Sequence, residues 1–596
     1  MPNTLDGLLA QLILDMTSPE REPDWLESYA TDRHDWRETT SNGRLSYFRR
    51  IGVVETFFDI DGCDFEGRAD LTIHLQVELK TSLVVQNLKE RILLAWSILR
   101  QAHVLLSTKI LDAKQVEIMD AEYAPEDRLF VFQPVSTPDE MLAEAKKHAS
   151  FLEEHYDKVD ADDFFVHTQN SSRCIDASIA LGKLYVLPVK LDNRGVCQLD
   201  LVLIAAHEIT DGLSSARWIS HFVDLLNTSS QELASHANDI CQNSALTRLP
   251  PAQESLYPPM QGNLARQRWS WLLSRILRHT RNPPPASFQN PLRRKVTLDK
   301  AIALSPKYSK VIDYNRVPPL NSYRIRAALS PASTRRLAEI CRKAKISIGS
   351  GGFALVAIVM MLFEERRNPN VPLNQRLPFV GSFPINPRPF LKGTPTTGKE
   401  DSLMLAFSDG ITLPFLPSDL EFEGRLKLLG KQAARQLRQY QKRPRSLEEE
   451  IHMGSKSPTQ LFPLLYLGTI ERREMRSRPE RKRGWDIQGG YPAKTSATLA
   501  TCGVSSVGAR GSILSSGKHD TGRLPPGVDV VADFRKLDTS VRARDGEFLV
   551  GVVGDQDCIR FGVSYDGCGI DPELAQEFKH VLESILESGG APAAKL

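Results

Sequence analysis

The chain runs twice from an apolar strand through a short turn into an amphipathic helix, at residues 199–227 and 559–587. A Pro-rich stretch at 246–320 separates the two units. Because 596 residues exceed what one hydrophobic core usually supports, we predict an α/β protein of two lobes, each a mixed sheet with flanking helices. The predicted boundaries are 1–245 for the N-terminal lobe, 246–320 for the crossover linker, 321–588 for the C-terminal lobe and 589–596 for a flexible tail.

Hydrophobic periodicity and turn residues predict the main elements of both lobes. In the first half we expect strands within 45–80, a helix at 83–102, a hairpin turning at 192–195 and a helix at 213–227. The crossover contains one expected helix, at 265–280. In the second half we expect helices at 331–345 and 352–364, a helical region at 418–450 and a hairpin turning at 554–557.

The composition is that of an ordinary soluble protein and argues against several classes of partner. The net charge is +2, from 75 basic and 73 acidic residues, which gives no electrostatic basis for nucleic-acid binding. The apolar stretch at 351–363 is too short to cross a bilayer, so we expect no stable membrane insertion. Eight scattered cysteines without a CxxC pair predict neither a disulfide framework nor a metal site.

The two ends of the chain bear on its location. The first residues lack the basic start of a signal peptide, so we expect an intracellular protein. We also expect the protein to be a monomer. The last three residues, Ala594-Lys595-Leu596, are similar to the Ser-Lys-Leu peroxisomal address. A chance ending of a frayed terminus is the alternative. Both a cytoplasmic and a peroxisomal location therefore stay open.

One strand end carries residues suited to chemistry. The apolar run LVLIAA at 201–206 ends at His207, and Asp211 and Gly212 follow. A neutral imidazole accepts a proton near pH 7, and a strand end holds its backbone in place, so His207 is a candidate general base. Gly212 would let the chain turn tightly into the next helix. The structural alternative is a histidine satisfied by a backbone carbonyl, with Asp211 as the N-cap of helix 213–227.

Three further segments accompany this motif in order: GSFPINPRPFL at 381–391, GVSSVGARGSIL at 503–514 and IRFGVSYDGCGIDPELAQEF at 559–578. With the strand–HxxxDG–helix unit, they resemble the chloramphenicol-acetyltransferase-like superfamily, which includes peptide-synthetase condensation domains and HxxxD acyltransferases. The layout is most similar to fungal trichothecene 15-O-acetyltransferase-like enzymes. The resemblance extends over about residues 45–588 and implies an active-site tunnel at the interface of two lobes.

The resemblance also implies a role for each site residue. His207 would be the general base, and Asp211 would pair with Arg388 of the NPRP segment instead of relaying charge to the histidine. Gly212 would allow backbone approach near the site. Ser505 or Ser506 would offer a hydroxyl to the oxyanion and line the tunnel, although a backbone N–H or an ordinary polar strand end explains them equally. No metal and no bound cofactor is implied, and acyl-CoA would be a co-substrate.

Two departures from the family pattern narrow the expected activity. Condensation domains usually carry a second histidine where this chain has Ala206, and the chain contains no carrier-domain serine motif. The predicted function is therefore acyl-CoA-dependent O-acylation, chiefly acetylation, of a hydroxylated secondary metabolite. A stand-alone condensation enzyme using a carrier-bound acyl donor, a non-catalytic binding protein on the same fold, and a cyclase remain as alternatives.

Three other segments have a structural and a functional interpretation. The arginine-rich run at 471–484 is expected to be a mobile surface insertion, with an anion site as the alternative. The helix containing Trp269 and Trp271 is expected to pack on a lobe, with contact to a membrane surface as the alternative. Ser350 in IGSGGF lacks the setting of a hydrolase nucleophile and is expected to mark the start of the helix at 352–364.

Overall fold

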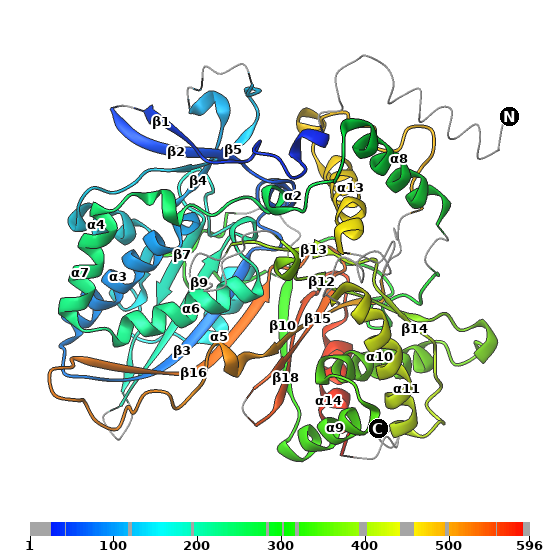
Figure 1. The fold of residues 1–596 in the computed structure, drawn as a ribbon. Helices are drawn as coiled ribbons and strands as arrows, with labels where there is room; N and C mark the ends of the chain where they lie inside the picture. The colour runs from blue at the N-terminus through cyan, green and yellow to red at the C-terminus, as the bar shows by residue number, and fades with distance from the viewer. Residues whose placement is uncertain are drawn as a thin grey trace.

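The computed structural model describes residues 25–587 except 42, 117, 119–121, 192–195, 282–284, 301–302, 316–320, 392–401, 442–457, 495–499 and 556. The predicted turn at 192–195, the tail at 589–596 and the end of the 418–450 region therefore lie outside the described residues. Within the described part, two six-stranded sheets lie side by side, each with its own helices (Figure 1). The two-lobed α/β architecture expected from the sequence is thus confirmed.

The sheet of the first lobe has the order β16-β3-β9-β7-β6, with β8 paired to β9. Its strands are β3 (Leu71–Thr81), β6 (Ala149–Phe151), β7 (Gly182–Val186), β8 (Lys190–Leu191), β9 (Cys197–Ala205) and β16 (Val530–Val541). Helices α3 (Val85–Ala102), α4 (Pro138–Lys147), α6 (Gly212–Asn227) and α7 (Ser230–Gln242) pack together, and α6 lies on β16. Helix α5 (Ala161–Gln169) packs on β3.

The sheet of the second lobe has the order β10-β18-β17-β15-β11-β14. Its strands are β10 (Ser322–Ala328), β11 (Phe379–Ser382), β14 (Ile411–Leu413), β15 (Cys502–Ala509), β17 (Phe548–Gly554) and β18 (Ile559–Asp566). The helices around it are α9 (Pro331–Ala344), α10 (Ile348–Arg367), α11 (Phe422–Gln441) and α14 (Pro572–Ser584). Helix α10 is long and apolar enough to cross a membrane, but most of its residues are buried in this lobe.

The IGSGGF sequence at the start of α10 is explained by close packing. The Ser347 hydroxyl caps the helix by accepting from the Ser350 backbone N–H. A Cβ atom on Gly351 would lie 2.3 Å from the Cys341 Sγ, and one on Gly352 would lie 2.9 Å from Val552. These glycines let α10 approach α9 and β17, so the segment forms the N-terminus of a core helix, and the expected position of Ser350 at the helix start is confirmed.

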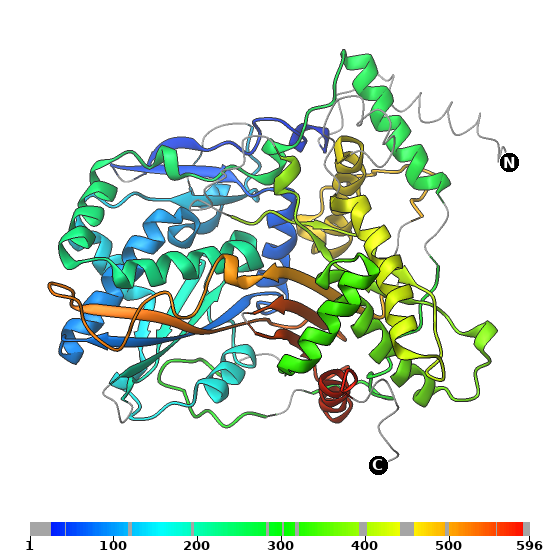
Figure 2. The same cartoon turned by 60° about the horizontal axis from the view of Figure 1, so that its bottom comes forward.

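Strand β16 crosses from the second half of the chain into the sheet of the first lobe. It pairs antiparallel with β3 from Val530 opposite Thr81 to Val541 opposite Leu71, and Figure 2 shows it beside that strand. The predicted boundary at residue 321 therefore does not separate the two sheets. Long-range strand exchange of this kind leaves no local signal in the sequence, because periodicity reports a strand but not its partner.

Residues 53–64 are helical, so the expectation of strands throughout 45–80 was wrong for this segment. Helix α2 (Val53–Asp64) follows β2 (Arg44–Arg50) and has a capping box in which the Glu55 carboxylate accepts from the Gly52 backbone N–H at 2.6 Å. Its β-branched and aromatic residues are buried on most of its circumference, which removes the helical periodicity. Strand β2 belongs to a separate four-stranded sheet with β1 (Arg37–Ser41), β4 (Lys109–Asp112) and β5 (Arg128–Phe132).

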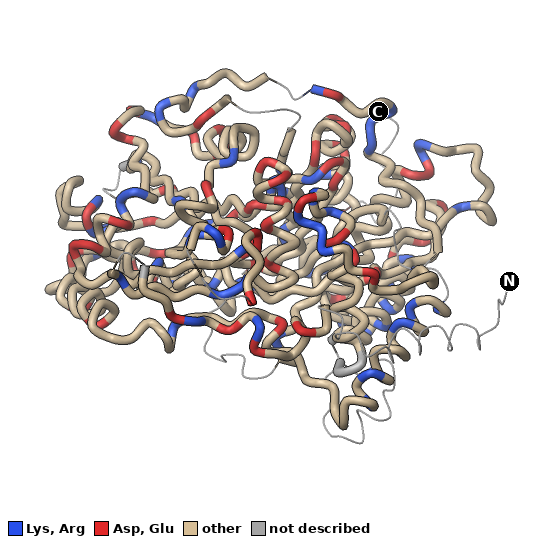
Figure 3. Tube along the Cα trace, turned by 90° about the horizontal axis from the view of Figure 1, so that it is seen from above, with Lys and Arg blue, Asp and Glu red and all other residues tan. Residues whose placement is uncertain are grey.

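The crossover and the arginine-rich region pack against one another. Helix α8 (Leu264–Thr280) contacts α13 (Pro458–Arg476), with Trp271 buried and Trp269 exposed. Helix α13 also packs on α2, so the first part of the 471–484 run belongs to a packed helix, while residues 478–480 and 482–484 are exposed at the surface. Two arginines of the 471–484 run form ion pairs with α2: Arg476 pairs with Asp61 and Arg478 with Asp64. Seen from above, basic and acidic positions are interspersed along the trace (Figure 3).

Candidate active site

His207 lies in a short turn between the central strand of the first lobe and a long helix. Strand β9 ends at Ala205, a 3-10 turn covers His207–Ile209, and α6 begins at Gly212. The Ile209 side chain is fully buried, which fixes the turn against the core. The Asp211 carboxylate caps α6 by accepting from the backbone N–H groups of Leu213 and Ser214 at 2.9 and 3.0 Å. The backbone of His207 is therefore held on both sides.

The imidazole of His207 stacks on Phe58 of α2, with ring centroids 4.0 Å apart and an interplanar angle of 11°. Burial lowers the pKa of His207, and the Arg544 guanidinium lowers it further, while the backbone carbonyls of His207 and Thr210 act in the opposite direction. The ring is therefore neutral near pH 7. Among the described residues the buried Nδ1 has no hydrogen-bond partner, and the residue as a whole is partly exposed.

The structure brings Asp211 and Arg388 together. The Arg388 Nη2 donates to Asp211 Oδ2 at 2.7 Å and also to the Ser214 hydroxyl at 2.8 Å and the Ser402 carbonyl at 2.6 Å. The Met404 backbone N–H donates to the same Asp211 oxygen at 3.0 Å. Burial alone would raise the pKa of Asp211, but the Arg388 charge and the backbone donors hold it below its usual value. Asp211 is thus an ionised anchor that ties the first lobe to the second.

The backbone conformation of the turn does not require a glycine at position 212. It is the first residue of α6, its φ lies outside the left-handed region, and a Cβ atom on it would meet no atom within 4 Å. The expected need for glycine at a tight turn was therefore wrong. Gly212 is exposed and lines a cavity, so its missing side chain leaves open space in front of the α6 N-terminus.

This cavity has a volume of about 570 Å³ and lies between the lobes. The N-terminus of α6 contributes one wall, and the other walls come from α10, α11, β15 and the β12 strand (Pro384–Ile385). Ser505 and Ser506 of β15 both line it, as the sequence led us to expect for a tunnel position. Its wall reaches Asp211 and Gly212, while His207 itself does not border it.

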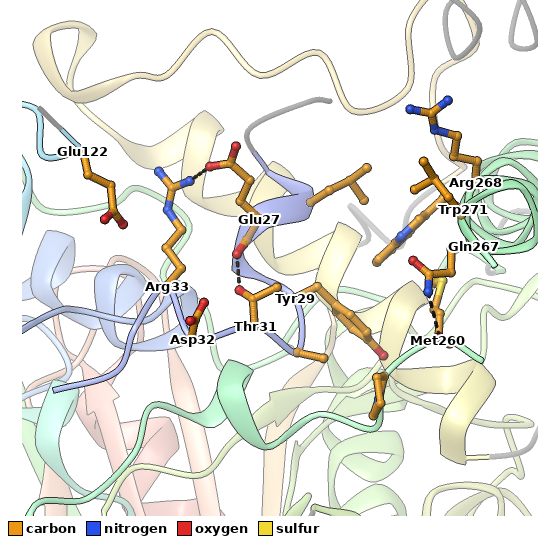
Figure 4. A pocket seen from close by; sticks show the side chains of 14 residues that line it. Glu27, Tyr29, Thr31, Asp32, Arg33, Glu122, Met260, Gln267, Arg268 and Trp271 are labelled. Carbon is orange, nitrogen blue, oxygen red and sulfur yellow. Dashed lines mark hydrogen bonds and ion pairs between the residues drawn. The ribbon is translucent and has the colours of Figure 1, made fainter. Parts of the chain in front are cut away.

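A second cavity, of about 500 Å³, lies between residues 26–33 and α8 (Figure 4). Its charged residues include Glu27 and Arg33, which pair with one another, and its apolar wall includes Trp271. None of the residues proposed for chemistry lines it. We therefore place the candidate site at the 570 Å³ cavity beside α6, on chemical grounds.

The sequence did not predict a buried network of charged residues next to His207, formed by Glu208, Arg173 and Asp70. Glu208 is fully buried, and Arg173 Nη2 lies 3.4 Å from its Oε1. The Arg173 guanidinium also donates to both carboxylate oxygens of Asp70, at 2.8 and 2.9 Å. Burial raises the pKa of Glu208 above its usual range, Arg173 opposes this, and the Asp70 charge adds to it.

Arg173 fits against α2 and the loop after it only because residues 62 and 67 are glycines. A Cβ atom on Gly62 would lie 2.4 Å from its guanidinium, and one on Gly67, where φ is +74°, would lie 2.7 Å from its Cγ. Arg173 thereby contacts both the turn after β9 and the end of α2, which carries the Phe58 ring. The sequence signal was the acid-rich stretch DIDGCDFEG at 59–67, which is unusual beside apolar residues but does not identify its partner.

The described residues contain no group of three or more His, Cys, Asp or Glu side chains arranged to hold a metal ion, and all eight cysteines are free thiols. The structure thus places a neutral imidazole in a turn whose Asp211 and Gly212, but not His207 itself, reach the wall of an apolar cavity.

Comparison with solved structures shows that this two-lobed α/β fold, with the HxxxDG turn and the Asp211–Arg388 pair between its lobes, is shared with known proteins. Among solved structures, TRI3 trichothecene 15-O-acetyltransferase from Fusarium sporotrichioides matches with a TM-score of 0.60 and 12% identity, over 94% of this chain and 98% of that one. The first condensation domain of the calcium-dependent antibiotic synthetase matches with a TM-score of 0.48 and 11% identity, over 94% and 98%. Neither a scan against protein-family models nor a comparison with curated protein sequences yields a match.

Proposed function

We propose that this protein is an acyl-CoA-dependent O-acyltransferase with His207 as its general base. The observation that carries the proposal is the neutral imidazole of His207, stacked on Phe58 and held in a turn that the Asp211–Arg388 pair anchors. A base needs a pKa near or below the working pH and a fixed orientation, and this residue has both. The fold shared with a trichothecene acetyltransferase supports the same class of reaction.

In the proposed reaction, Nε2 of His207 accepts the proton of the acceptor hydroxyl as the oxygen attacks the thioester carbonyl. The tetrahedral oxyanion collapses by breaking the carbon–sulfur bond, and the thiolate of coenzyme A takes the proton back from the imidazolium. The ester and free coenzyme A are the products, and the base is regenerated. Ser505 or Ser506 is the proposed hydroxyl donor to the oxyanion, since both face the cavity.

The proposed acceptor is a hydroxylated, largely apolar secondary metabolite. The cavity wall is dominated by apolar side chains such as Phe353, Phe383, Met404 and Leu437, and its charged residues Asp211 and Arg388 neutralise one another. Its volume of about 570 Å³ lies within the range of roughly 300–1,000 Å³ that accommodates small organic ligands. We propose an acetyl or other short acyl group as the donor, which needs little further space.

The test is acyl transfer by the purified full-length protein. Radiolabelled acetyl-CoA and longer acyl-CoAs would be incubated with an extract of hydroxylated metabolites, and labelled esters would be separated by chromatography. We expect His207→Ala to abolish transfer while its circular dichroism spectrum stays unchanged, and His236→Ala, at an exposed position of α7, to retain full activity. Undiminished transfer by His207→Ala would refute the base assignment. Transfer from a carrier-bound acyl group and not from acyl-CoA would instead favour a condensation enzyme.

A further inference from the structure

A small cleft, separate from the cavity beside α6, lies between α2 and the chain that follows α13. Its volume is about 80 Å³. One wall is the face of α2 that carries Val53, Thr56 and Ile60, and the opposite wall is formed by Arg473 and the residues up to Trp485. Basic side chains outnumber acidic ones around it by seven to four. The cleft therefore has an excess of basic side chains around it, of which Lys482 and Arg483 are exposed to solvent.

The two buried acidic side chains of the cleft, Asp59 and Asp127, are already paired with arginines. Asp59 accepts from the Arg128 guanidinium at 2.7 and 3.0 Å. Asp127 accepts from Arg50 at 3.2 Å and also pairs with Arg483. These pairs hold the walls together, but they leave no buried carboxylate for the remaining basic groups.

Arg473 is the basic residue of the cleft that is at least partly buried and has no ion pair among the described residues. Its guanidinium lies over the Trp485 ring, 4.7 Å from the centroid, and among the residues that the structure describes it has no hydrogen bond or ion pair. Burial lowers the pKa of Arg473 to about 10, and the nearby Arg483 charge contributes to this. Arg473 is partly buried, its Nε is buried without a partner, and a second cation lies near it, so the approach of a negative charge is favourable.

A second polar group in the cleft is also unsatisfied. His34 is only 4% exposed, and among the described residues its Nε2 has no hydrogen-bond partner. Nδ1 lies 3.4 Å from the Arg50 carbonyl oxygen and donates to it, so Nε2 of the neutral ring is an acceptor. Buried polar atoms in folded proteins are nearly always bonded, so an unpartnered Arg473 and an unpartnered His34 Nε2 at one cleft indicate a polar occupant. A hydrogen phosphate offers oxygens to Arg473 and a hydroxyl from which His34 Nε2 can accept. Arginine is the side chain best suited to bind phosphate, because its fork of donors matches two of the oxygens.

We infer that this cleft binds a single phosphate-type anion between α2 and the 473–485 segment. The volume supports this size, since about 80 Å³ is well above the roughly 10–15 Å³ that admits one water and well below the roughly 300 Å³ of small-molecule pockets. The anion would accept from Arg473 and reduce the repulsion between Arg473 and Arg483. It would also join the end of α13 to α2.

The site is distinct from the proposed chemistry, although the same helix borders both. Phe58, whose ring stacks on His207, does not line the cleft, whereas Val53, Thr56 and Ile60 do. A helix is about 10 Å across with its side chains, so the anion would lie roughly one helix diameter from the imidazole. Two sources fit this chemistry: free inorganic phosphate, or a phosphate group of coenzyme A whose remainder lies outside the cleft.

The inference is tested by measuring binding, so that its failure does not depend on whether the protein transfers acyl groups. Isothermal titration of the full-length protein with inorganic phosphate should show one site per chain. Arg473→Gln should weaken the affinity at least tenfold. Arg472→Gln, the same substitution one residue earlier on α13 and outside the cleft, should change it less than twofold.

Two further titrations identify the source of the phosphate. If coenzyme A competes with inorganic phosphate and 3′-dephospho-coenzyme A does not, the site holds the 3′-phosphate of the nucleotide. If neither competes, the site holds free phosphate, and both results support the inference. Absence of phosphate binding by the wild-type protein, or equal affinity of wild type and Arg473→Gln, would overturn it.

Discussion

Removing Arg388 should destabilise the protein by stranding a buried carboxylate. Asp211 is 6% exposed, and Arg388 is its ion-pair partner across the lobes. Breaking a buried pair by deleting one partner costs about 3–5 kcal/mol, because the remaining charge is buried without compensation. In the double variant Asp211→Asn/Arg388→Ala no charge is stranded, and asparagine keeps the acceptor that caps α6. We expect the double variant to lose only roughly 1–2 kcal/mol, from the lost hydrogen bonds.

The measurement is urea unfolding, combined with hydrogen exchange of the peptide covering 207–216, since a two-lobed chain need not unfold in one step. The wild-type pKa of Asp211 is depressed, so its contribution is present above the unfolded value of about 3.9 and is lost as the pH falls below it. In Arg388→Ala the positive charge of Arg388 is absent, so burial raises the pKa of Asp211. The gap between wild type and Arg388→Ala should therefore narrow from pH 7 towards pH 4. A double variant as unstable as Arg388→Ala would refute the argument from a stranded charge.

Four further predictions concern Phe58, the pH dependence of transfer, Glu208 and the C-terminal tail. Phe58→Leu should cost about 1–2 kcal/mol of stability, because leucine keeps most of the buried apolar area. It should lower kcat without raising the KM for acyl-CoA, because it removes the ring that stacks on His207. A change in KM alone would contradict this. Because the His207 pKa lies below its usual 6.5, transfer should be constant above about pH 6.5 and fall below it, and a limb centred above pH 7 would contradict the base. The melting temperature of Glu208→Gln, relative to that of the wild type, should rise between pH 5 and pH 8. The pKa of Glu208 is higher in the folded protein than its value of about 4.3 in the unfolded chain, so raising the pH destabilises the wild type and not the variant. A difference in melting temperature that does not change with pH would contradict this. We also propose that the last ten residues send a fluorescent reporter to peroxisomes and that the same tail without Leu596 leaves it in the cytoplasm; identical distributions would contradict the signal.

The local geometry around His207 could be predicted because its signals are local. An apolar run, a polar cap and a helical pattern lie within 30 residues, and the helix expected at 213–227 is α6 at Gly212–Asn227. Both interpretations of Asp211 are realised at once, since it caps α6 and also pairs with Arg388. The pairing partner came from a family resemblance, because nothing in the spacing of residues 211 and 388 specifies a contact.

The surroundings of His207 could not be predicted from the sequence for a physical reason. The segment VVETFFDIDGCD is buried on most sides, so α2 shows no amphipathic pattern, and its β-branched and aromatic residues favour a strand when taken alone. The Phe58 stack on His207 was hidden by that wrong assignment. The pairing of strand β16 could not be predicted for another reason: its partner β3 lies about 450 residues earlier in the chain.

These long-range contacts determine how the candidate site is held. Helix α2 belongs to the first half of the chain, but its Asp61 accepts from Arg544 at 2.7 Å and from Arg476, both in the second half. Arg544 also lies 5.7 Å from the centre of the Phe58 ring. The ring that orients His207 is therefore positioned from the second half, just as Asp211 is held by Arg388. Neither half contains a complete site, and any movement of the lobes against one another must change the setting of His207.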